Sequence, residues 1–564
     1  MNFNDMKYER PDFDALSKEM SGHIQQLKNA KTPEEFLSEF KKMNICRVHL
    51  NTMVTLAQVR HTINTADPFY DNENTYWDET MPKYQALDNQ FIAACVQYPD
   101  RSALLKEIPE TFFQLGECAL KSFDEKIIPE MVEENRLTSE YGKLKASAKI
   151  EFDGEMLNLA QIAAKTESKD RNTRKRAYDA KIAFYQAHEK EFDSIYDQLV
   201  HLRDTMAKKL GYSNYVEMAY YRMNRLDYDG KMIADYRDQI RSYVTPAAGR
   251  IYEKQRQRLG YDKLEYYDMV YEFKDGNPTP KGTPEQLIED ASKMYHEMSR
   301  ETGEFIDVMV NNNLWDLISR PNKEMGGYCT EIQEYKVPFI FSNFNGTSGD
   351  VNVLTHEAGH AFQSYMSKGI DIPDISFPTM ESCEIDSMSM EFFAYPWLKL
   401  FFQQDADKYR YSHLCGTLTF LPYGVLVDHF QQAVYENPDL TPDQRKGIWR
   451  TLEKQYMPFK NYDGCEFLEK GCWWFQQGHI FESPFYYIDY TLAQVCAQQF
   501  FIRMNKKDPD AWKDYIHLCK LGGTLSFTKL VKEAGLQVPF ENGCIPAVVD
   551  NLEAYLNNID DSAL

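Results

Sequence analysis

Two histidines in the run His356-Glu357-Ala358-Gly359-His360 place the strongest constraint on how this chain can fold. A spacing of four residues is about one turn of an α-helix, so both imidazoles project from one face and can bind the same metal ion. Glu357 then lies beside the pair, where its carboxylate can reach a metal-bound water. We therefore expect a helix that presents His356 and His360 as zinc ligands, with Glu357 as the general base of a hydrolase.

Apolar side chains around this run predict an amphipathic helix. They are Val351, Leu354, Ala358, Ala361, Phe362 and Tyr365. These positions fall on one helical stripe, nearly opposite the two histidines, so the histidines can face a cavity while the stripe is buried. The alternative is a pair of histidines on a solvated helix face with no metal.

A catalytic zinc ion usually has three protein ligands and keeps a fourth position for water. Residues 380–391 contain no glycine or proline and predict a second helix that offers carboxylates. We expect Glu384 to be the third ligand, and Glu391, two turns further on, to hydrogen-bond one of the ligands. Glu381 and Asp386 are the alternatives, and either can be a helix surface residue.

Several separated blocks resemble the M3 family of zinc oligopeptidases, and within it the bacterial oligoendopeptidase F type, which is similar to the Pz-peptidases. The blocks are 326–329, 338–351, 355–363, 384–391, 479–490 and an N-terminal stretch at 62–73. Because they span most of the chain, they are more specific together than the five-residue motif alone. The resemblance implies a mainly α-helical, two-lobed, neurolysin-like metallopeptidase with a deep substrate channel and a small β-sheet near the zinc helix.

Residues 478–490 contain one histidine and three tyrosines that can donate hydrogen bonds to a developing oxyanion. In the family that the chain resembles, a histidine and two or three tyrosines of this block contact the substrate and stabilise the tetrahedral intermediate. We assign His479, Tyr487 and Tyr490 to catalysis, and Tyr486 to substrate binding as a reserve. Since the chain has 37 tyrosines, aromatic core packing is the alternative for each of them.

Residues 335–344 are rich in aromatic and β-branched residues and predict a strand. Pro338 cannot donate to a β-ladder, so we expect an edge strand, to which an extended peptide can add by main-chain hydrogen bonds. The turn after the strand is predicted to let a substrate backbone approach closely. Its residues are Gly346, Thr347, Ser348 and Gly349. Ser348 or Asp350 is expected to cap the zinc helix, and an ordinary strand-to-helix turn is the alternative.

The rest of the sequence predicts long helices. Apolar residues recur at three- and four-residue spacing from Pro11 to about Lys145, with breaks near Asp67-Pro68 and Pro99-Asp100. An Asp-Gly turn within 149–159 predicts a small hairpin, and the Gly/Pro-rich stretch 274–284 predicts a loop. From the resemblance we expect a helical N-terminal region over residues 1–199 that walls the channel, and a catalytic region over residues 200–564.

The composition restricts the partners and the compartment. With 63 basic against 86 acidic residues the net charge is −23, which argues against nucleic acid or an anionic membrane as a partner. Eleven cysteines without a Cys-x-x-Cys pair indicate free thiols in a reducing compartment. The N-terminus lacks the apolar core of a signal peptide, and the longest apolar run, 414–427, is too short to span a bilayer. We expect a cytoplasmic protein, and the oligomeric state stays open.

The resemblance implies a zinc-dependent oligoendopeptidase, with one Zn²⁺ per chain, that hydrolyses internal bonds of short unstructured peptides. Two alternatives stay open. An exopeptidase of the same family that removes C-terminal dipeptides would need a basic group placed to hold the terminal carboxylate. A non-catalytic, helical peptide-binding protein would bind no stoichiometric zinc.

Overall fold

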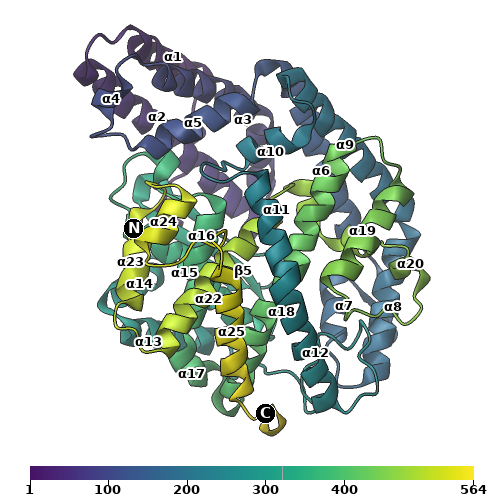
Figure 1. The fold of residues 1–564 in the computed structure, drawn as a ribbon. Helices are drawn as coiled ribbons and strands as arrows, with labels where there is room; N and C mark the ends of the chain where they lie inside the picture. The colour runs from purple at the N-terminus through teal and green to yellow at the C-terminus, as the bar shows by residue number, and fades with distance from the viewer. Residues whose placement is uncertain (321, 325) are drawn as a thin grey trace.

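The computed structural model describes residues 1–320, 322–324 and 326–564, and it is mainly helical, so the predicted fold class is confirmed. The first helices are α1 (Phe13–Asn29), α2 (Pro33–Ile63), α3 (Pro68–Val96), α4 (Arg101–Leu104), α5 (Glu110–Ser122) and α6 (Ile128–Ala146). The next are α7 (Leu159–Lys165), α8 (Arg171–Ala187), α9 (Glu189–Leu210), α10 (Tyr215–Arg222), α11 (Gly230–Gln239) and α12 (Thr245–Leu259). Figure 1 shows α1 to α5 in purple, gathered above the rest of the molecule.

The later helices hold the predicted site residues. They are α13 (Pro284–Met298), α14 (Arg300–Asn311), α15 (Gly349–Ser367), α16 (Met380–Phe393), α17 (Leu398–Phe402), α18 (Ala406–Glu436), α19 (Pro442–Tyr456), α20 (Glu466–Glu469), α21 (Gly478–Glu482), α22 (Tyr487–Asn505), α23 (Ala511–Leu521), α24 (Phe527–Glu533) and α25 (Cys544–Asn557). Helix α15 packs against α16, and α16 packs against α22, so these three helices form the centre of the fold.

Several helices begin at a capping side chain that is followed directly by proline. The pairs are Thr32-Pro33 in α2, Asp67-Pro68 in α3, Thr283-Pro284 in α13 and Thr441-Pro442 in α19. Each cap oxygen accepts a first-turn N–H, and proline at this position has no N–H to leave unpaired. The predicted break at Asp67-Pro68 and the loop that ends at Pro284 are therefore confirmed.

Two small sheets are present in the described part of the chain. The predicted hairpin is confirmed as β1 (Ile150–Phe152) paired antiparallel with β2 (Glu155–Leu157). The other sheet contains β3 (Trp315–Ile318), β4 (Tyr328–Ile332) and β5 (Val337–Phe344) in the order β3-β5-β4. Strand β5 contacts α15, which confirms the expected sheet beside the helix that carries the two histidines.

The prediction that the strand with Pro338 is an edge strand is wrong, because β5 is the central strand. The N–H of Ile340 donates to the carbonyl of Leu314 (3.0 Å), on the side of β3. Strand backbone alternates in direction, so the nitrogen of Pro338 faces the same side. Since β3 pairs with β5 only from Ile340 onward, no hydrogen bond is lost at Pro338. The edge beside β5 is formed by β4 instead.

The N-terminal helices are joined to the rest of the molecule by apolar and charged contacts. Buried residues of α2 and of the central helices belong to one continuous hydrophobic cluster. Arg47 of α2 donates two hydrogen bonds of 2.8 Å to Asp374, in the segment before α16, and a third of 2.6 Å to Asp88 of α3. Such a bidentate pair fixes orientation as well as distance.

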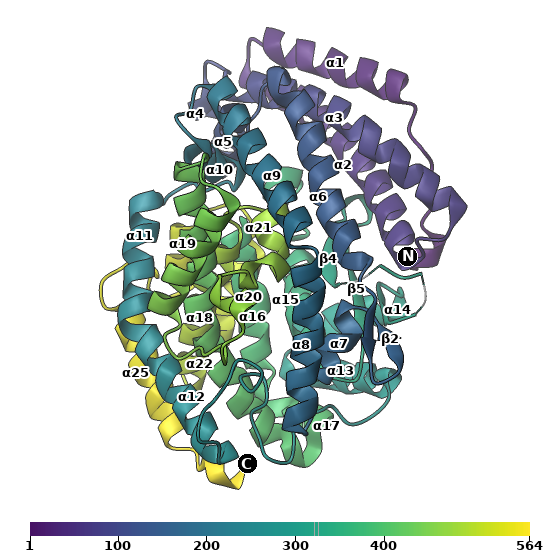
Figure 2. The ribbon, with the colours of Figure 1, turned by 90° about the vertical axis from the view of Figure 1, so that its right-hand side faces the viewer.

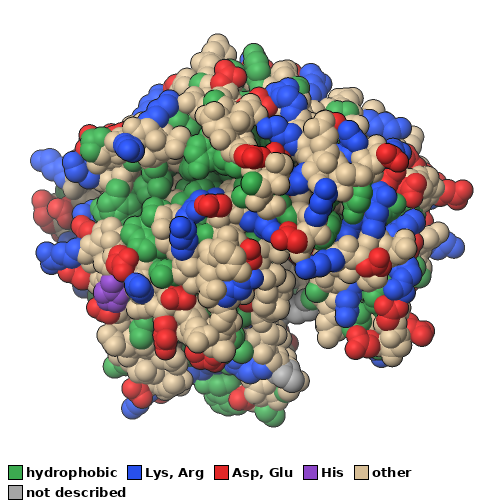
Figure 3. All heavy atoms as spheres, turned by 90° about the horizontal axis from the view of Figure 1, so that it is seen from below, with side chains coloured by type: hydrophobic (Ala, Val, Ile, Leu, Met, Phe, Trp, Pro, Cys, Tyr) green, Lys and Arg blue, Asp and Glu red, His purple; other side chains and the backbone are tan. Residues whose placement is uncertain are grey.

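The surface offers no broad basic area on the face seen in Figure 3, where basic and acidic side chains are mixed around an apolar patch. Among the described helices, none has the length and apolarity needed to cross a membrane. All eleven cysteines lie in the described part of the chain and are free.

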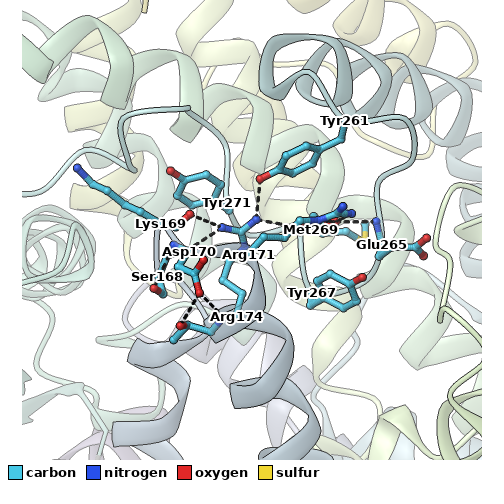
Figure 4. A network of polar contacts seen from close by, with 12 residues as sticks. Ser168, Lys169, Asp170, Arg171, Arg174, Tyr261, Glu265, Tyr267, Met269 and Tyr271 are labelled. Atoms are coloured by element: carbon cyan, nitrogen blue, oxygen red, sulfur yellow. Dashed lines mark hydrogen bonds and ion pairs between the residues drawn. The ribbon is translucent and has the colours of Figure 1, made fainter. Parts of the chain in front are cut away.

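A buried ion network holds the start of α8 against the segment that follows α12 (Figure 4). Asp268 accepts hydrogen bonds from Arg171 (2.6 Å) and Arg174 (3.0 Å), and the side chains of Arg174 and Asp268 are fully buried. Arg174 also donates to the hydroxyl of Tyr261 (3.0 Å), and Gln255 donates to three carbonyls of the same segment, among them that of Asp268 (3.1 Å). The segment 261–271 is thus fixed by polar contacts from α8 and α12.

Asp268→Asn should destabilise the fold by about 3–5 kcal/mol, because it leaves the buried Arg174 without its counter-charge. The matched control is Asp235→Asn, since Asp235 pairs with Lys231 on the exposed face of α11 and such pairs contribute about 1 kcal/mol or less. Urea denaturation of both variants measures the difference. Equal midpoints for Asp268→Asn and the control would show that the network adds no stability.

Candidate metal site

Helices α15 and α16 bring the three predicted ligands together. The ligand atoms of His356, His360 and Glu384 all lie within 4.8 Å of one another. The Nε2 atoms of His356 and His360 lie 3.3 Å and 3.5 Å from Oε2 of Glu384. Glu384 is buried, with 3% of its surface exposed. Two imidazole nitrogens and one carboxylate oxygen fit a divalent metal such as zinc, with room for a water ligand.

Gly359 sets the distance between the two helices. A Cβ atom at this position would lie 2.6 Å from Cα of Ser387 and 2.8 Å from the carbonyl oxygen of Asp386, both on α16. Since real Cβ atoms do not approach backbone so closely, any side chain here would force α15 and α16 apart. The glycine inside the motif therefore lets Glu384 reach the two histidines.

Glu391 orients the ring of His356 through Nδ1, the nitrogen that does not face Glu384. Its two carboxylate oxygens lie 2.6 Å from Nδ1 of His356 and 2.6 Å from Nε2 of His413. Tyr395 binds the other nitrogen of His413 at 2.7 Å. Burial opposes the ionised form of Glu391, but the two histidines outweigh it and hold its pKa at about 2. With Nδ1 of His356 held by a carboxylate, Nε2 is left to bind a metal.

Glu381 and Asp386, the alternative ligands, lie outside this group. Both are buried, so the expectation that they are surface residues is wrong. Glu381 accepts a hydrogen bond from Thr379 (3.1 Å), and Asp386 contacts the thiol of Cys519 (3.4 Å). Burial raises the pKa of both carboxyls well above the usual range. Neither belongs to the group of His356, His360 and Glu384.

Glu357 faces the edge strand β4. An added Cβ at Gly327, directly before β4, would lie 3.8 Å from Oε1 of Glu357. The nitrogen of Pro338 points away from β4, so the backbone hydrogen bonds between β4 and β5 are made by the even-numbered residues of β4. Cys329, at an odd position, therefore directs its N–H and carbonyl away from β5. An unpaired strand edge therefore runs beside the glutamate of the motif.

The tyrosine block adjoins the same group. Tyr486 donates to Oε1 of Glu384 (2.8 Å), and the hydroxyl of Tyr490 lies 3.5 Å from Nε2 of His479. The ring of Tyr487 lies 4.9 Å from that of His479 and 5.8 Å from that of Phe420, measured between centroids. Burial lowers the pKa of His479 to about 4, so its ring is neutral at pH 7. The reserve residue of the sequence analysis, Tyr486, is thus the one whose hydroxyl contacts a predicted ligand.

The predicted substrate-binding turn closes on itself. Asp350 accepts hydrogen bonds from the backbone N–H groups of Asn345 and Gly346, each at 2.8 Å. Ser348 occupies the cap position of α15 but makes no side-chain cap bond. Gly346 has φ of +83°, which favours glycine, and both Gly346 and Gly349 are exposed. The expectation that Ser348 or Asp350 caps α15 is therefore wrong, and Asp350 stabilises the turn before the helix instead.

Sequence reasoning missed His413, Tyr395 and Gln477. His413 lies within α18, and no local motif marks it; only its contact with Glu391 in the folded chain does. The Nε2 atom of Gln477 lies 2.9 Å from Nδ1 of His479. Gln477 could have been suggested from the sequence, because it precedes His479 by two positions and its amide can hydrogen-bond one nitrogen of the His479 ring.

Glu391→Gln should lower the affinity for a divalent metal about 10–100-fold, because a neutral amide orients His356 less well and withdraws the charge behind the ring. Competition with a chelator, followed by analysis of bound metal, measures the effect. The control is Glu304→Gln on the exposed surface of α14, where Glu304 pairs with Arg300. An affinity equal to that of the control would remove Glu391 from the metal site.

Comparisons with known proteins agree with this geometry. Residues 3–123 match the peptidase M3 N-terminal domain, and residues 164–549 match peptidase family M3. An oligoendopeptidase F homolog of Mycoplasma genitalium is 22% identical over 398 residues, which cover 66% of this chain and 63% of that protein. An oligoendopeptidase F homolog of Borreliella burgdorferi is 24% identical over 372 residues, which cover 64% and 60%. The chain thus spans less than two thirds of the length of these curated relatives.

A solved structure of Pz peptidase A with an inhibitor is 49% identical, covers 100% of both chains and superposes with a TM-score of 0.96. The resemblance to the oligoendopeptidase F type is therefore confirmed. Since the family model covers more than half of its length, this chain belongs to peptidase family M3.

Proposed function

We propose that this protein is a zinc-dependent oligoendopeptidase that hydrolyses internal bonds of short, unstructured peptides. The observation that carries the proposal is the group of His356, His360 and Glu384, with Glu357 beside it and a strand edge within reach. One Zn²⁺ per chain would be held by the two Nε2 atoms and the carboxylate. Membership of a peptidase family supports this assignment.

The bound ion would lower the pKa of a water ligand towards neutrality and polarise the scissile carbonyl. Glu357 would take a proton from the attacking water on its carboxylate and would deliver it to the leaving amine. His479 and Tyr490 donate hydrogen bonds to the oxyanion, and Tyr486 and Tyr487 complete the set of candidate donors. Because these donors are neutral, they add no buried charge to a site that already contains two carboxylates.

The substrate would lie along β4 as an added strand. The outward N–H and carbonyl of Cys329 supply main-chain hydrogen bonds that do not depend on the peptide sequence. The turn Gly346 to Gly349 stays a candidate for a further backbone contact. Residues 1–199 would wall a deep channel over residues 200–564 and exclude folded proteins. Free thiols and an acidic surface suit a cytoplasmic enzyme that acts on neutral or basic peptides.

The two alternatives give different results in simple assays. An exopeptidase that releases C-terminal dipeptides would fail on peptides blocked at the C-terminus, whereas an endopeptidase cleaves them. A peptide-binding protein without catalysis would contain no stoichiometric zinc and would show no cleavage that a chelator abolishes. Mass spectrometry of a digested peptide library, with and without chelator, distinguishes all three.

Glu357→Gln should keep the metal bound and lose most turnover, because it removes the proton acceptor and none of the three ligands. General-base catalysis is worth about 10²–10⁴-fold in rate. Metal content and cleavage rate are measured on the same sample, with Glu304→Gln as the control. Activity within about tenfold of wild type would exclude Glu357 as the general base.

Tyrosine-to-phenylalanine changes at 486, 487 and 490 test the oxyanion donors, because each removes a hydroxyl and keeps the ring. Loss of one such donor costs about 10²–10³-fold in kcat. We expect at least one of the three to show this loss with normal metal content and an unchanged melting temperature. A lower melting temperature with unchanged kcat would instead indicate packing. If all three remain near wild type, the donors lie elsewhere.

A further inference from the structure

A cavity of about 460 Å³ adjoins the tyrosine block. Aromatic rings form most of its wall, and they belong to Tyr178, Tyr252, Tyr266, Phe420, Tyr423 and Trp473. Gln477 also lines the cavity, and its side chain contacts both Tyr423 (2.9 Å) and His479 (2.9 Å). The cavity is therefore separated from the candidate site by no more than these side chains, and a peptide bound at the site could extend into it.

Three lysines from separate elements lie around the turn η8 (Trp473–Gln476), whose residues Trp473 and Gln476 line the cavity. Lys181 of α8 donates to Oε1 of Gln476 (2.8 Å), and Nζ of Lys145, on α6, lies 3.5 Å from the carbonyl oxygen of Gln476. Lys460 lines the cavity, with Nζ 3.6 Å from the centre of the Trp473 ring. Figure 2 shows α6 and α8 on the same face of the molecule, with α20 beside α8.

The positive charge of this group is only partly balanced, by Glu482 near Lys145 and by Glu453 near Lys460. Within the described chain, no carboxylate forms an ion pair with Lys145 or Lys181. Lys460 lies 3.4 Å from Glu453, which Arg450 also contacts at 3.1 Å. Burial, together with the charges of Lys145 and Lys460, lowers the pKa of Lys181 to about 8. Partly buried cations of like charge repel one another, so an anion bound among them would be stabilised.

The opposite wall of the cavity is held in place before any ligand binds. Tyr266, Met269 and Val270 line the cavity, and they belong to the segment that Asp268 and the two arginines of α8 fix (Figure 4). The carbonyl of Met269 also accepts a hydrogen bond from Gln255 (3.1 Å). A preformed aromatic wall reduces the entropy cost of binding an extended chain segment.

We propose that Lys145, Lys181 and Lys460 bind a carboxylate of the peptide substrate, whose end segment occupies the aromatic cavity. This inference rests on the proposed function, since it assigns one end of the substrate to a place beside the site. Ammonium groups bind a C-terminal carboxylate and an Asp or Glu side chain by the same chemistry. The site selects and aligns peptides and takes no part in bond cleavage, so blocked peptides are cleaved as well, with a lower kcat/KM.

Calorimetric titration of the full-length Glu357→Gln protein, loaded with zinc, tests the proposal without cleavage. The probes are neutral peptides of increasing length, each with a free C-terminal carboxylate, with a C-terminal amide, or with the amide and one glutamate near the end. We expect the free acid to bind at least about tenfold more tightly than the amide at one or more lengths, because hydrogen bonds to a charged group are stronger than those to a neutral one. The third series shows whether a side-chain carboxylate substitutes for the terminus.

Lys181→Met and Lys460→Met, made in the same protein, should bring the acid-to-amide affinity ratio toward one and leave the affinity for the amide unchanged. Lys190→Met is the matched control, because Lys190 is exposed on α9 and should keep the full ratio. Equal affinities of all three peptide series for the parent protein would overturn the proposal. A parallel loss for acid and amide in the lysine variants would also overturn it, since the lysines would then only hold the turn at Gln476. Cleavage by the wild-type enzyme is a separate measurement, so failure of the proposed function is distinguishable from failure of this site.

Discussion

The close packing of α15 on α16 at Gly359 is the constraint on which the rest of the site depends. A metal group needs donor atoms within a few ångströms of one another, and here the donors come from two helices. Only a residue without Cβ allows the backbone of α16 to reach the motif helix. The same kind of contact recurs where α18 meets α22, since a Cβ at Gly424 would lie 2.2 Å from Cγ2 of Thr491. Glycine at these two contacts thus lets the central helices pack closely enough to share one site.

Buried carboxylates are the second element of this design. Glu384 and Glu391 are both removed from water, which costs free energy unless positive or polar partners compensate. His356, His360 and His413 supply those partners, and Glu391 connects the metal group to α18. In a chain with a net charge of −23, the two central carboxylates need these histidine partners to offset the cost of burial. A bound divalent cation would complete the charge balance.

Local patterns in the sequence predicted the features that depend on local geometry. The four-residue spacing of His356 and His360 and the helical position of Glu384 follow from the period of an α-helix, and the structure brings these residues together. His413 could not be predicted, because its contact with Glu391 joins helices that are remote from the motif. The edge position of β5 was predicted wrongly for the same reason: its parallel partner β3 is a nonlocal neighbour.

The tyrosine block shows how a single backbone angle limits prediction. Phe485 has φ of +69°, a backbone angle that residues other than glycine rarely adopt. Nothing in the local sequence predicts this angle. This bend is followed by α22, whose first residue is Tyr487; the hydroxyl of Tyr486 reaches Glu384, and the ring of Tyr487 packs beside that of His479. Arg225 stabilises the bend through a hydrogen bond of 2.6 Å to the carbonyl of Phe485. The backbone that carries Tyr486 and Tyr487 is therefore held by a buried arginine far away in the sequence.

The turn η8 links the cavity to the oxyanion side of the site. Two lysines contact Gln476 at its end, and the next residue, Gln477, contacts His479. A carboxylate bound among the lysines would therefore lie next to the segment Gln476-Gln477, which also positions the ring of His479. Endopeptidase and exopeptidase activities differ in how strictly they require a terminal carboxylate. In this arrangement the proposed carboxylate site lies beside the candidate oxyanion donors without being part of them. Recognition of a peptide end would then improve alignment and still permit cleavage of blocked peptides.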